Sequence, residues 1–179
     1  NLGENMFEAF VEGYVKYTRN ILDFKDGADL LLNPRLETAL LSGVGTAHGV
    51  EFSVSKIRGR LQGFINYTFS RSLRKIGGSS GSEQINNGSE YPSNFDQPHV
   101  GNISWRYGIS TRHYFSGNFT YHSGRPMSVP RSGFVIDGVP VTDFSSRNTA
   151  RIPDYHRLDI AFIIEGNHKL KKLTHNSWS

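Results

Sequence analysis

Six stretches of the chain alternate apolar and polar residues, and each is roughly ten residues long, which is long for a β-strand. They are residues 7–17, 46–56, 60–70, 98–107, 113–122 and 155–165. Successive side chains of a β-strand point to opposite faces of the sheet. The alternation therefore predicts six strands, each with one apolar face and one polar face.

The connections between these stretches alternate between short turns and long polar loops. Short turns follow the second and fourth stretches, and the basic stretch 168–172 indicates a third turn after the sixth. Long loops follow the first, third and fifth stretches, and Ile136-Asp137-Gly138-Val139 predicts a small hairpin inside the last loop. This rhythm predicts an up-and-down antiparallel sheet with all short turns at one end.

A sheet of this kind fits the wall of an outer-membrane β-barrel, because only helices and closed sheets satisfy every backbone group in hydrocarbon. The apolar faces would meet lipid and the polar faces would line the interior. Short turns would then be periplasmic and long loops extracellular. The inward polar residues are predicted to be Glu8, Glu12, Lys16, Glu51, Gln62, Asn66, Asn102, Arg106, Asn118 and Asp159.

Composition excludes several other classes of protein, but it does not by itself establish an outer-membrane barrel. Mean hydropathy is -0.45 and no run of about 18 apolar residues occurs, so a membrane-spanning helix is excluded. The net charge of +4 is spread over loops and turns, which gives a nucleic-acid interface little support. The chain has no cysteine, so disulfides and thiolate metal sites are excluded. Composition alone is also compatible with a soluble all-β domain.

Motifs of catalysis and metal binding are weak in this sequence. Residues 77–81 match the G-x-S-x-G pattern of hydrolases but lie in a Gly/Ser-rich loop without the required strand and helix. Asp23, Asp26 and Asp29 lack the alternating ligands and distal glutamate of a calcium loop, so turn-forming aspartates are favoured. We predict no enzyme activity, no catalytic residue, no metal site and no cofactor, and the substrate-binding residues stay unknown.

Three motifs at strand boundaries resemble a known family. They are 90–99 (EYPSNFDQPH) entering a strand, 121–126 (YHSGRP) leaving one and 152–159 (IPDYHRLD) entering the next. Together with the early loop 26–33 and Gly49-Val50-Glu51, they resemble the C-terminal barrel of TonB-dependent outer-membrane receptors, in the branch with a carboxypeptidase-like regulatory domain. The resemblance covers essentially all of residues 1–179.

The resemblance implies a 22-stranded transmembrane barrel that surrounds an N-terminal plug and imports a nutrient ligand with energy relayed by TonB. The ligand would be a siderophore, a glycan, a peptide or a similar molecule. Implied partners are outer-membrane lipids, the protein's own plug, TonB through that plug, and a surface lipoprotein. The six strands would form a partial arc of the wall, since no plug, TonB box or signal peptide is present and both ends look cut from something longer.

Two other functions remain open from sequence. One is a complete small outer-membrane barrel with a structural or adhesive role, which would need eight strands and intact ends. The other is a soluble β-sandwich binding module, in which apolar faces of two sheets would meet each other. Within the receptor hypothesis, Asp96, Pro98, His99 and the turn Gly124-Arg125-Pro126 are interpreted as strand-entry and strand-exit devices rather than as ligand-binding groups.

Overall fold

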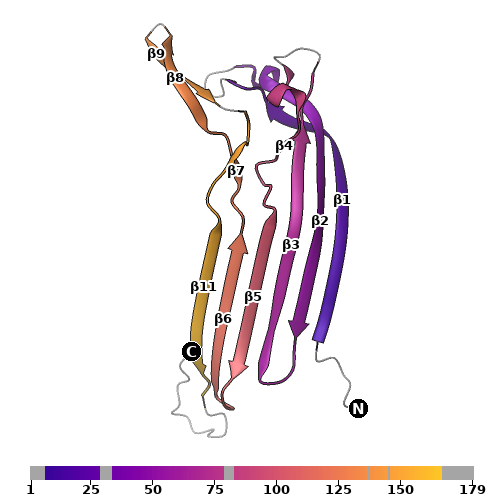
Figure 1. Cartoon of the computed structure of the whole chain (residues 1–179), viewed down its shortest axis with the longest axis vertical. Helices are drawn as coiled ribbons and strands as arrows, with labels where there is room; N and C mark the ends of the chain where they lie inside the picture. Colours follow the sequence, from indigo (N-terminus) through magenta and orange to yellow (C-terminus); the bar gives the residue numbers. More distant parts are fainter. Residues whose placement is uncertain (1–6, 29–33, 79–82, 137, 145, 167–179) are drawn as a thin grey trace.

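The fold is an all-β, antiparallel sheet built from six long strands (Figure 1). This computed structural model describes residues 7–28, 34–78, 83–136, 138–144 and 146–166. The long strands are β1 (Phe7–Phe24), β2 (Leu40–Lys56), β3 (Leu61–Lys75), β5 (His99–Gly108), β6 (His113–His122) and β11 (Tyr155–Ile164). Within the described ranges, no helix is long and apolar enough to cross a membrane.

The strands follow each other in space in the order of the chain. The sheet order is β1-β2-β3-β5-β6-β11, and each neighbouring pair is antiparallel. The short turns 57–60 and 109–112 lie at one end and the long connections at the other (Figure 1). We call these the turn end and the loop end. The predicted meander is thus confirmed for the described residues, whereas the turn predicted at 168–172 lies outside them.

The register places the predicted apolar positions on one continuous face, called here the apolar face. Ile65 illustrates this, because it lies directly opposite Val54 on one side and Ile103 on the other. The same row continues through Phe119 to Leu158. Other members of the face are Phe7, Val11, Val15, Val50, Phe52, Tyr67, Phe69, Trp105, Tyr107, Phe115, Ile160, Phe162 and Ile164.

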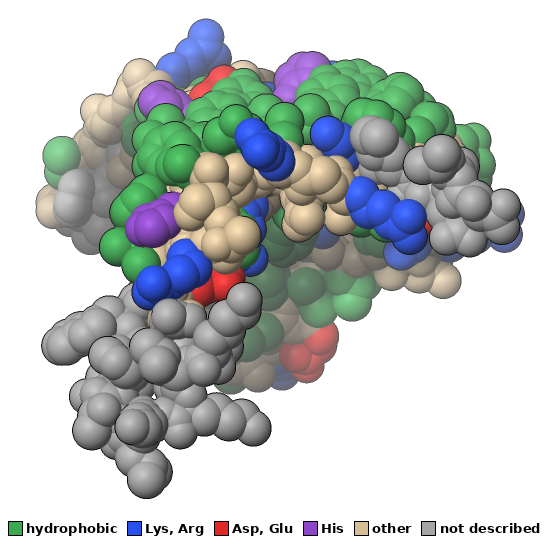
Figure 2. Space-filling model, turned by 90° about the horizontal axis from the view of Figure 1, so that it is seen from below, with side chains coloured by type: hydrophobic (Ala, Val, Ile, Leu, Met, Phe, Trp, Pro, Cys, Tyr) green, Lys and Arg blue, Asp and Glu red, His purple; other side chains and the backbone are tan. Residues whose placement is uncertain are grey.

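The apolar face is exposed rather than packed into a core. Ile65 is 53% exposed, Leu158 58% and Phe162 56%. Among the described residues, the buried apolar side chains are Ala39, Ile76, Ile85, Tyr91 and Pro126. The chain exposes 13623 Å², against about 8,700 Å² expected for a compact domain of its mass. Figure 2 shows hydrophobic side chains covering the arched side of this single layer.

The opposite face carries the predicted inward polar residues, and the register confirms that they share one side. Glu12 lies opposite Glu51, Asn66 opposite Asn102, and Asn118 opposite Asp159. Several of these groups bond across strands. The hydroxyl of Ser53 donates to Asn66 Oδ1 at 2.7 Å, and that of Thr120 donates to Asn102 Oδ1 at 3.0 Å.

Strands β1 and β2 are longer than predicted, so the loop between them is shorter. A bulge lies at Asn20, which has φ 56°, and the pairing shifts there between Arg19 and Ile21. One extra residue reverses the alternation, so Asp23 lies on the polar face instead of the apolar face. The predicted end of the strand at Tyr17 was therefore wrong, because the phase change hid the last part of the strand.

The loop end holds the small hydrophobic core of the described chain. Ile76, Ile85 and Tyr91 form a buried cluster, and Leu41 packs against it. Short elements surround this cluster: the 3-10 turns η1 (Leu36–Ala39) and η3 (Asn86–Gly88), and strand β4 (Tyr91–Pro92), which pairs with the upper part of β3. β3 therefore extends to Lys75, five residues beyond its predicted end at Ser70.

The third long connection contains the predicted hairpin. Strands β8 (Pro130–Ile136) and β9 (Val139–Phe144) pair with each other, and β7 (Pro126–Met127) pairs with β10 (Ala150–Arg151). Gly138 has φ 82°, which is the left-handed conformation that this tight turn needs. The β8–β9 hairpin projects beyond the loop end of the sheet (Figure 1).

The sheet is open. Within the described residues, β1 and β11 each pair along one side only, so they form its two edges and no closed barrel is present. The structure thus contains six antiparallel strands of one curved layer.

The bulge at Asn20 gives the first prediction. Asn20→Val places a β-branched side chain at positive φ and should lower the free energy of unfolding by about 1–2 kcal/mol. Asn20→Gly is the matched control and should change it by less than about 0.5 kcal/mol. Urea unfolding of the natural protein and both variants measures this difference, and equal stability of the two variants would contradict the assigned backbone conformation.

Candidate functional site

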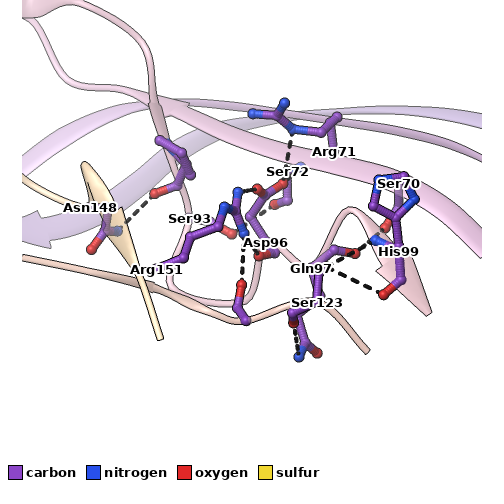
Figure 3. Close-up of polar contacts among 12 residues, drawn as sticks. Ser70, Arg71, Ser72, Ser93, Asp96, Gln97, His99, Ser123, Asn148 and Arg151 are labelled. Carbon is purple, nitrogen blue, oxygen red and sulfur yellow. Dashed lines mark hydrogen bonds and ion pairs between the residues drawn. The ribbon is translucent and has the colours of Figure 1, made fainter. Parts of the chain in front are cut away.

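Residues in or directly next to the three boundary motifs of the sequence meet in one polar network at the loop end, and Figure 3 shows the part of this network around Asp96. Asp96 comes from the segment before β5, Ser123 and Gly124 follow β6, and Arg151 and Asp154 precede β11. Hydrogen bonds and ion pairs connect all of them. Segments that are far apart in the sequence are thereby held together where the long loops leave the sheet.

Asp96 is the centre of this network. Its side chain is fully buried and accepts a hydrogen bond from the Ser72 backbone N–H at 2.6 Å. Arg151 Nη2 binds Asp96 Oδ2, and Arg71 Nε lies 3.5 Å from Oδ1, an ion pair rather than a hydrogen bond. Two guanidinium groups and one backbone donor thus compensate the charge of a carboxylate that water does not reach.

Arg151 also binds backbone groups of two loops. Its Nη1 donates to the carbonyl oxygen of Asp96 at 2.7 Å and to that of Gly124 at 2.9 Å. The chain passes so closely at Gly124 that an added Cβ would lie 1.7 Å from the carbonyl oxygen of Ile152. Only glycine fits there, which explains the glycine of the motif that leaves β6.

A second set of bonds fixes the first residues of β5 against the end of β6. Ser123 Oγ accepts a hydrogen bond from the His99 backbone N–H at 3.0 Å, and the Ser123 N–H donates to the His99 carbonyl at 2.8 Å. Gln97 Nε2 donates to the Ser123 carbonyl at 3.0 Å and lies 3.0 Å from His122 Nδ1. The interpretation of these motifs as strand-entry and strand-exit devices agrees with this geometry.

Asp154 holds the start of β11 in the same way. It accepts a hydrogen bond from the Tyr121 hydroxyl at 2.6 Å and another from the Gly124 backbone N–H at 2.9 Å. Both bonds favour the carboxylate, the Tyr121 bond more strongly, and they lower the pKa of Asp154 below its ordinary value.

A second ionic cluster, around Asp23, joins β1 to the loop between β9 and β10. Asp23 binds Arg147 at 2.8 Å, Arg74 at 3.3 Å and the Tyr91 hydroxyl at 2.9 Å, and Arg147 also binds Asp26 at 2.6 Å. Burial raises the pKa of Tyr91, and the bond to Asp23 raises it further. Asp23 and Asp26 therefore serve as ion-pair partners of arginine, while Asp29 lies outside the described residues.

Neighbouring amide side chains complete the anchoring of this loop. Asn86 and Arg147 exchange two hydrogen bonds, at 2.7 and 3.0 Å. Asn148 is buried, and its Nδ2 donates to the Pro92 carbonyl and to Asn94 Oδ1, both at 2.7 Å. The base of the β8–β9 hairpin is thus fastened to the segment that carries β4.

The chemistry of the loop-end network is that of a scaffold. Its carboxylates are neutralised by arginines of the same chain, and its serines bond to backbone groups. No group of three or more His, Asp or Glu residues that could hold a metal ion occurs in the described part of the chain. Residues 79–81 of the G-x-S-x-G match lie outside that part.

The polar face contains an open groove of about 720 Å³ at the turn end. Arg60, Arg106, Tyr114 and Glu165 contribute to its lining. Arg106 lies 3.6 Å from the centre of the Tyr114 ring and binds Glu165 at 2.7 Å. Sequence reasoning named Arg106 as inward-facing but gave no sign of its partner, because Glu165 follows it by 59 residues.

Comparisons of the chain with protein-family models, with curated proteins and with solved structures found no match. The proposed function therefore rests on the geometry and the sequence of this chain.

The buried position of Asp96 gives the second prediction. Asp96→Ala leaves Arg151 and Arg71 without their shared carboxylate and should lower the free energy of unfolding by about 3 kcal/mol. Asp143→Ala removes an exposed carboxylate from β9 and should change it by less than about 0.5 kcal/mol. Urea unfolding measures both effects, and equal values for the two variants would show that Asp96 is not the centre of the network.

The lowered pKa of Asp154 gives the third prediction. The group binds protons more weakly in the folded state, so its stabilising effect is complete above its ordinary pKa of 3.8 and disappears as the pH falls through the folded-state pKa. Asp154→Asn should therefore be less stable than the natural protein at pH 6, and this difference should shrink steadily below pH 3.8. A difference that stays constant from pH 6 to pH 3 would contradict the assignment.

Proposed function

We propose that this chain is a six-stranded section of the wall of a transmembrane β-barrel in the outer membrane of a Gram-negative bacterium. The barrel belongs to a TonB-dependent receptor that takes up a nutrient ligand. The observation that carries this proposal is the continuous, exposed apolar face of a sheet on which no second layer packs within the described ranges.

An apolar face of this extent requires an apolar partner. In a β-sandwich the partner is a second sheet, and the two inner faces pack about 10 Å apart. The described long strands all belong to one sheet, and the other described sheets are the two-stranded pairs β7–β10 and β8–β9 of the loop end, so no described sheet covers the apolar face as a sandwich requires. Lipid covers such a face without further protein, and the polar face then lines an aqueous interior.

Aromatic residues at both ends of the apolar face support the same reading. Trp105, Tyr107 and Phe115 lie toward the turn end, and the rings of Trp105 and Phe115 are 5.1 Å apart. Tyr67 and His99 lie toward the loop end and bond at 2.7 Å. His99 and Tyr107 are eight residues apart on β5, which corresponds to about 26 Å along the strand, close to the height of the apolar band of outer-membrane barrels.

The loop end supports a receptor role. The Asp96 and Asp23 clusters fasten three long connections to one end of the sheet, so the exposed β8–β9 hairpin stands on a rigid base. Binding loops are commonly held in this way by a scaffold. In the proposed receptor these loops face the outside and contact the ligand, an N-terminal plug occupies the interior and contacts TonB, and a surface lipoprotein is a further partner.

Single cysteines test the proposal, because the chain has none of its own. The fourth prediction compares neighbours on opposite faces: Ile65→Cys with Asn66→Cys, and Phe119→Cys with Asn118→Cys. Nitroxide labels on the apolar face should collide mainly with oxygen dissolved in lipid, and labels on the polar face mainly with a water-soluble nickel complex. The measurement is power-saturation electron paramagnetic resonance of the whole protein in lipid vesicles.

The same set of variants tests orientation. In intact cells, a membrane-impermeant maleimide should modify Ser132→Cys in the β8–β9 hairpin and leave Thr111→Cys in a short turn unmodified. Equal exposure of residues 65 and 66 to water would overturn the barrel wall. Modification of residue 111 alone would overturn the orientation.

A further inference from the structure

The two short turns of the sheet share an amphipathic pattern. The first reads Lys56-Ile57-Arg58-Gly59-Arg60 and the second Gly108-Ile109-Ser110-Thr111-Arg112. Each has an isoleucine at its second position and ends in an arginine. Ile57 is 54% exposed and Ile109 is 55% exposed, so both turns present a large apolar side chain at the same end of the sheet.

Several cations are close to these isoleucines in the sequence. Lys56 Nζ lies 5.6 Å from the centre of the Phe7 ring, at the lower border of the apolar face. Arg112 Nε donates to the Glu165 carbonyl at 2.8 Å, which holds its guanidinium group at the base of the sheet. Arg58 and Arg60 are exposed. Figure 2 looks onto this end and shows Lys and Arg side chains beneath the hydrophobic layer.

Charge is distributed differently at the two ends of the sheet. At the loop end Arg74, Arg147 and Arg151 bind carboxylates of the same chain. The described residues of the turn end include more cations than carboxylates: Lys56, Arg58, Arg60, Arg106 and Arg112 against Glu8 and Glu165, of which Glu165 binds Arg106. This excess gives the turn end a positive potential that attracts anions.

The order of residue types along the strands matches the layers of a lipid leaflet. The apolar face comes first, the aromatic pair of Trp105 and Phe115 follows, and the turns with isoleucine and arginine come last. Hydrocarbon, the interfacial region and the phosphate layer occur in the same order in a membrane. Continuity with the apolar face is the reason why a lipid surface fits better than an acidic protein partner.

We propose that the turn end is a binding surface for the phosphate groups of anionic phospholipids, with phosphatidylglycerol as the representative headgroup. Arg58, Arg60 and Arg112 bind the phosphates, while Ile57 and Ile109 enter the boundary between headgroups and acyl chains. This inference rests on the proposed function, because it requires that the apolar face lies in a membrane. The inference adds a preference for anionic lipid in one leaflet, which a barrel wall in a membrane does not by itself require.

Native mass spectrometry of the whole protein tests the lipid preference. Released from detergent micelles that contain equal amounts of phosphatidylglycerol and phosphatidylethanolamine, the natural protein should retain at least three times more of the anionic lipid. The variant Arg58→Gln/Arg60→Gln/Arg112→Gln should lose this preference. Arg131→Gln, an exposed cation of the loop-end hairpin, should keep it. Equal retention of both lipids by the natural protein, or an unchanged preference in the triple variant, would overturn the proposal.

A second measurement tests the role of the isoleucines. It also tests the proposal if the triple variant fails to fold. A bimane label on Ile57→Cys or Ile109→Cys should be quenched by brominated phosphatidylglycerol, whereas a label on Ser132→Cys should not. Absence of quenching at both turns would overturn the inference. If the labels at residues 65 and 66 still report lipid and water, only the lipid preference fails. If that pattern fails as well, the proposed function fails with it.

Discussion

The fold depends on the hydrogen-bonded register of a single sheet that cannot bury its own apolar side chains. Each strand pair keeps like residues in one row, so Val54, Ile65, Ile103 and Phe119 add to one face without a break. A two-layer protein would turn this face inward and gain hydrophobic stabilisation. Here the face is exposed, and the buried apolar side chains of the described chain are confined to the loop end. Stability along the wall must therefore come from the medium or the partner that covers it.

The loop end is stabilised by the chain itself. Asp96 and Asp23 each bring together arginines from distant segments, and Asp23 reaches Arg147 across 124 residues. A buried carboxylate is costly unless its charge is compensated, so the cluster of the fully buried Asp96 depends on all of its segments being in place. This makes the arrangement of the long connections cooperative. The two parts are consequently stabilised in different ways. The long strands depend on whatever covers their apolar face, whereas the long connections are held by contacts within the chain.

Alternation alone was sufficient to predict the six strands, their order and the side on which each residue lies, because period two is a local property of a strand. It failed where one residue broke the phase, at Asn20, and where polar residues formed the strand, as in the last part of β3. The boundary motifs contained Asp96, Ser123, Gly124 and Asp154 of the loop-end network, but they missed Arg71 and Arg151 and gave no sign of the pairing. The pairing of Asp96 with Arg151, like that of Arg106 with Glu165, depends on the three-dimensional path of the loops. A single sequence carries no local signal of that path.

The two edges of the sheet impose a final physical requirement on the proposed function. Within the part of the chain that the structure describes, β1 and β11 pair along one side only, so each presents a row of backbone N–H and C=O groups without a strand partner on its other side. Water could satisfy these groups in solution, but hydrocarbon cannot, and every unsatisfied group there costs several kcal/mol. If the apolar face lies in lipid, as proposed, both edges therefore require further strands as pairing partners. A closed barrel of which these strands form one arc would meet both requirements, the cover of the apolar face and the pairing of the edges.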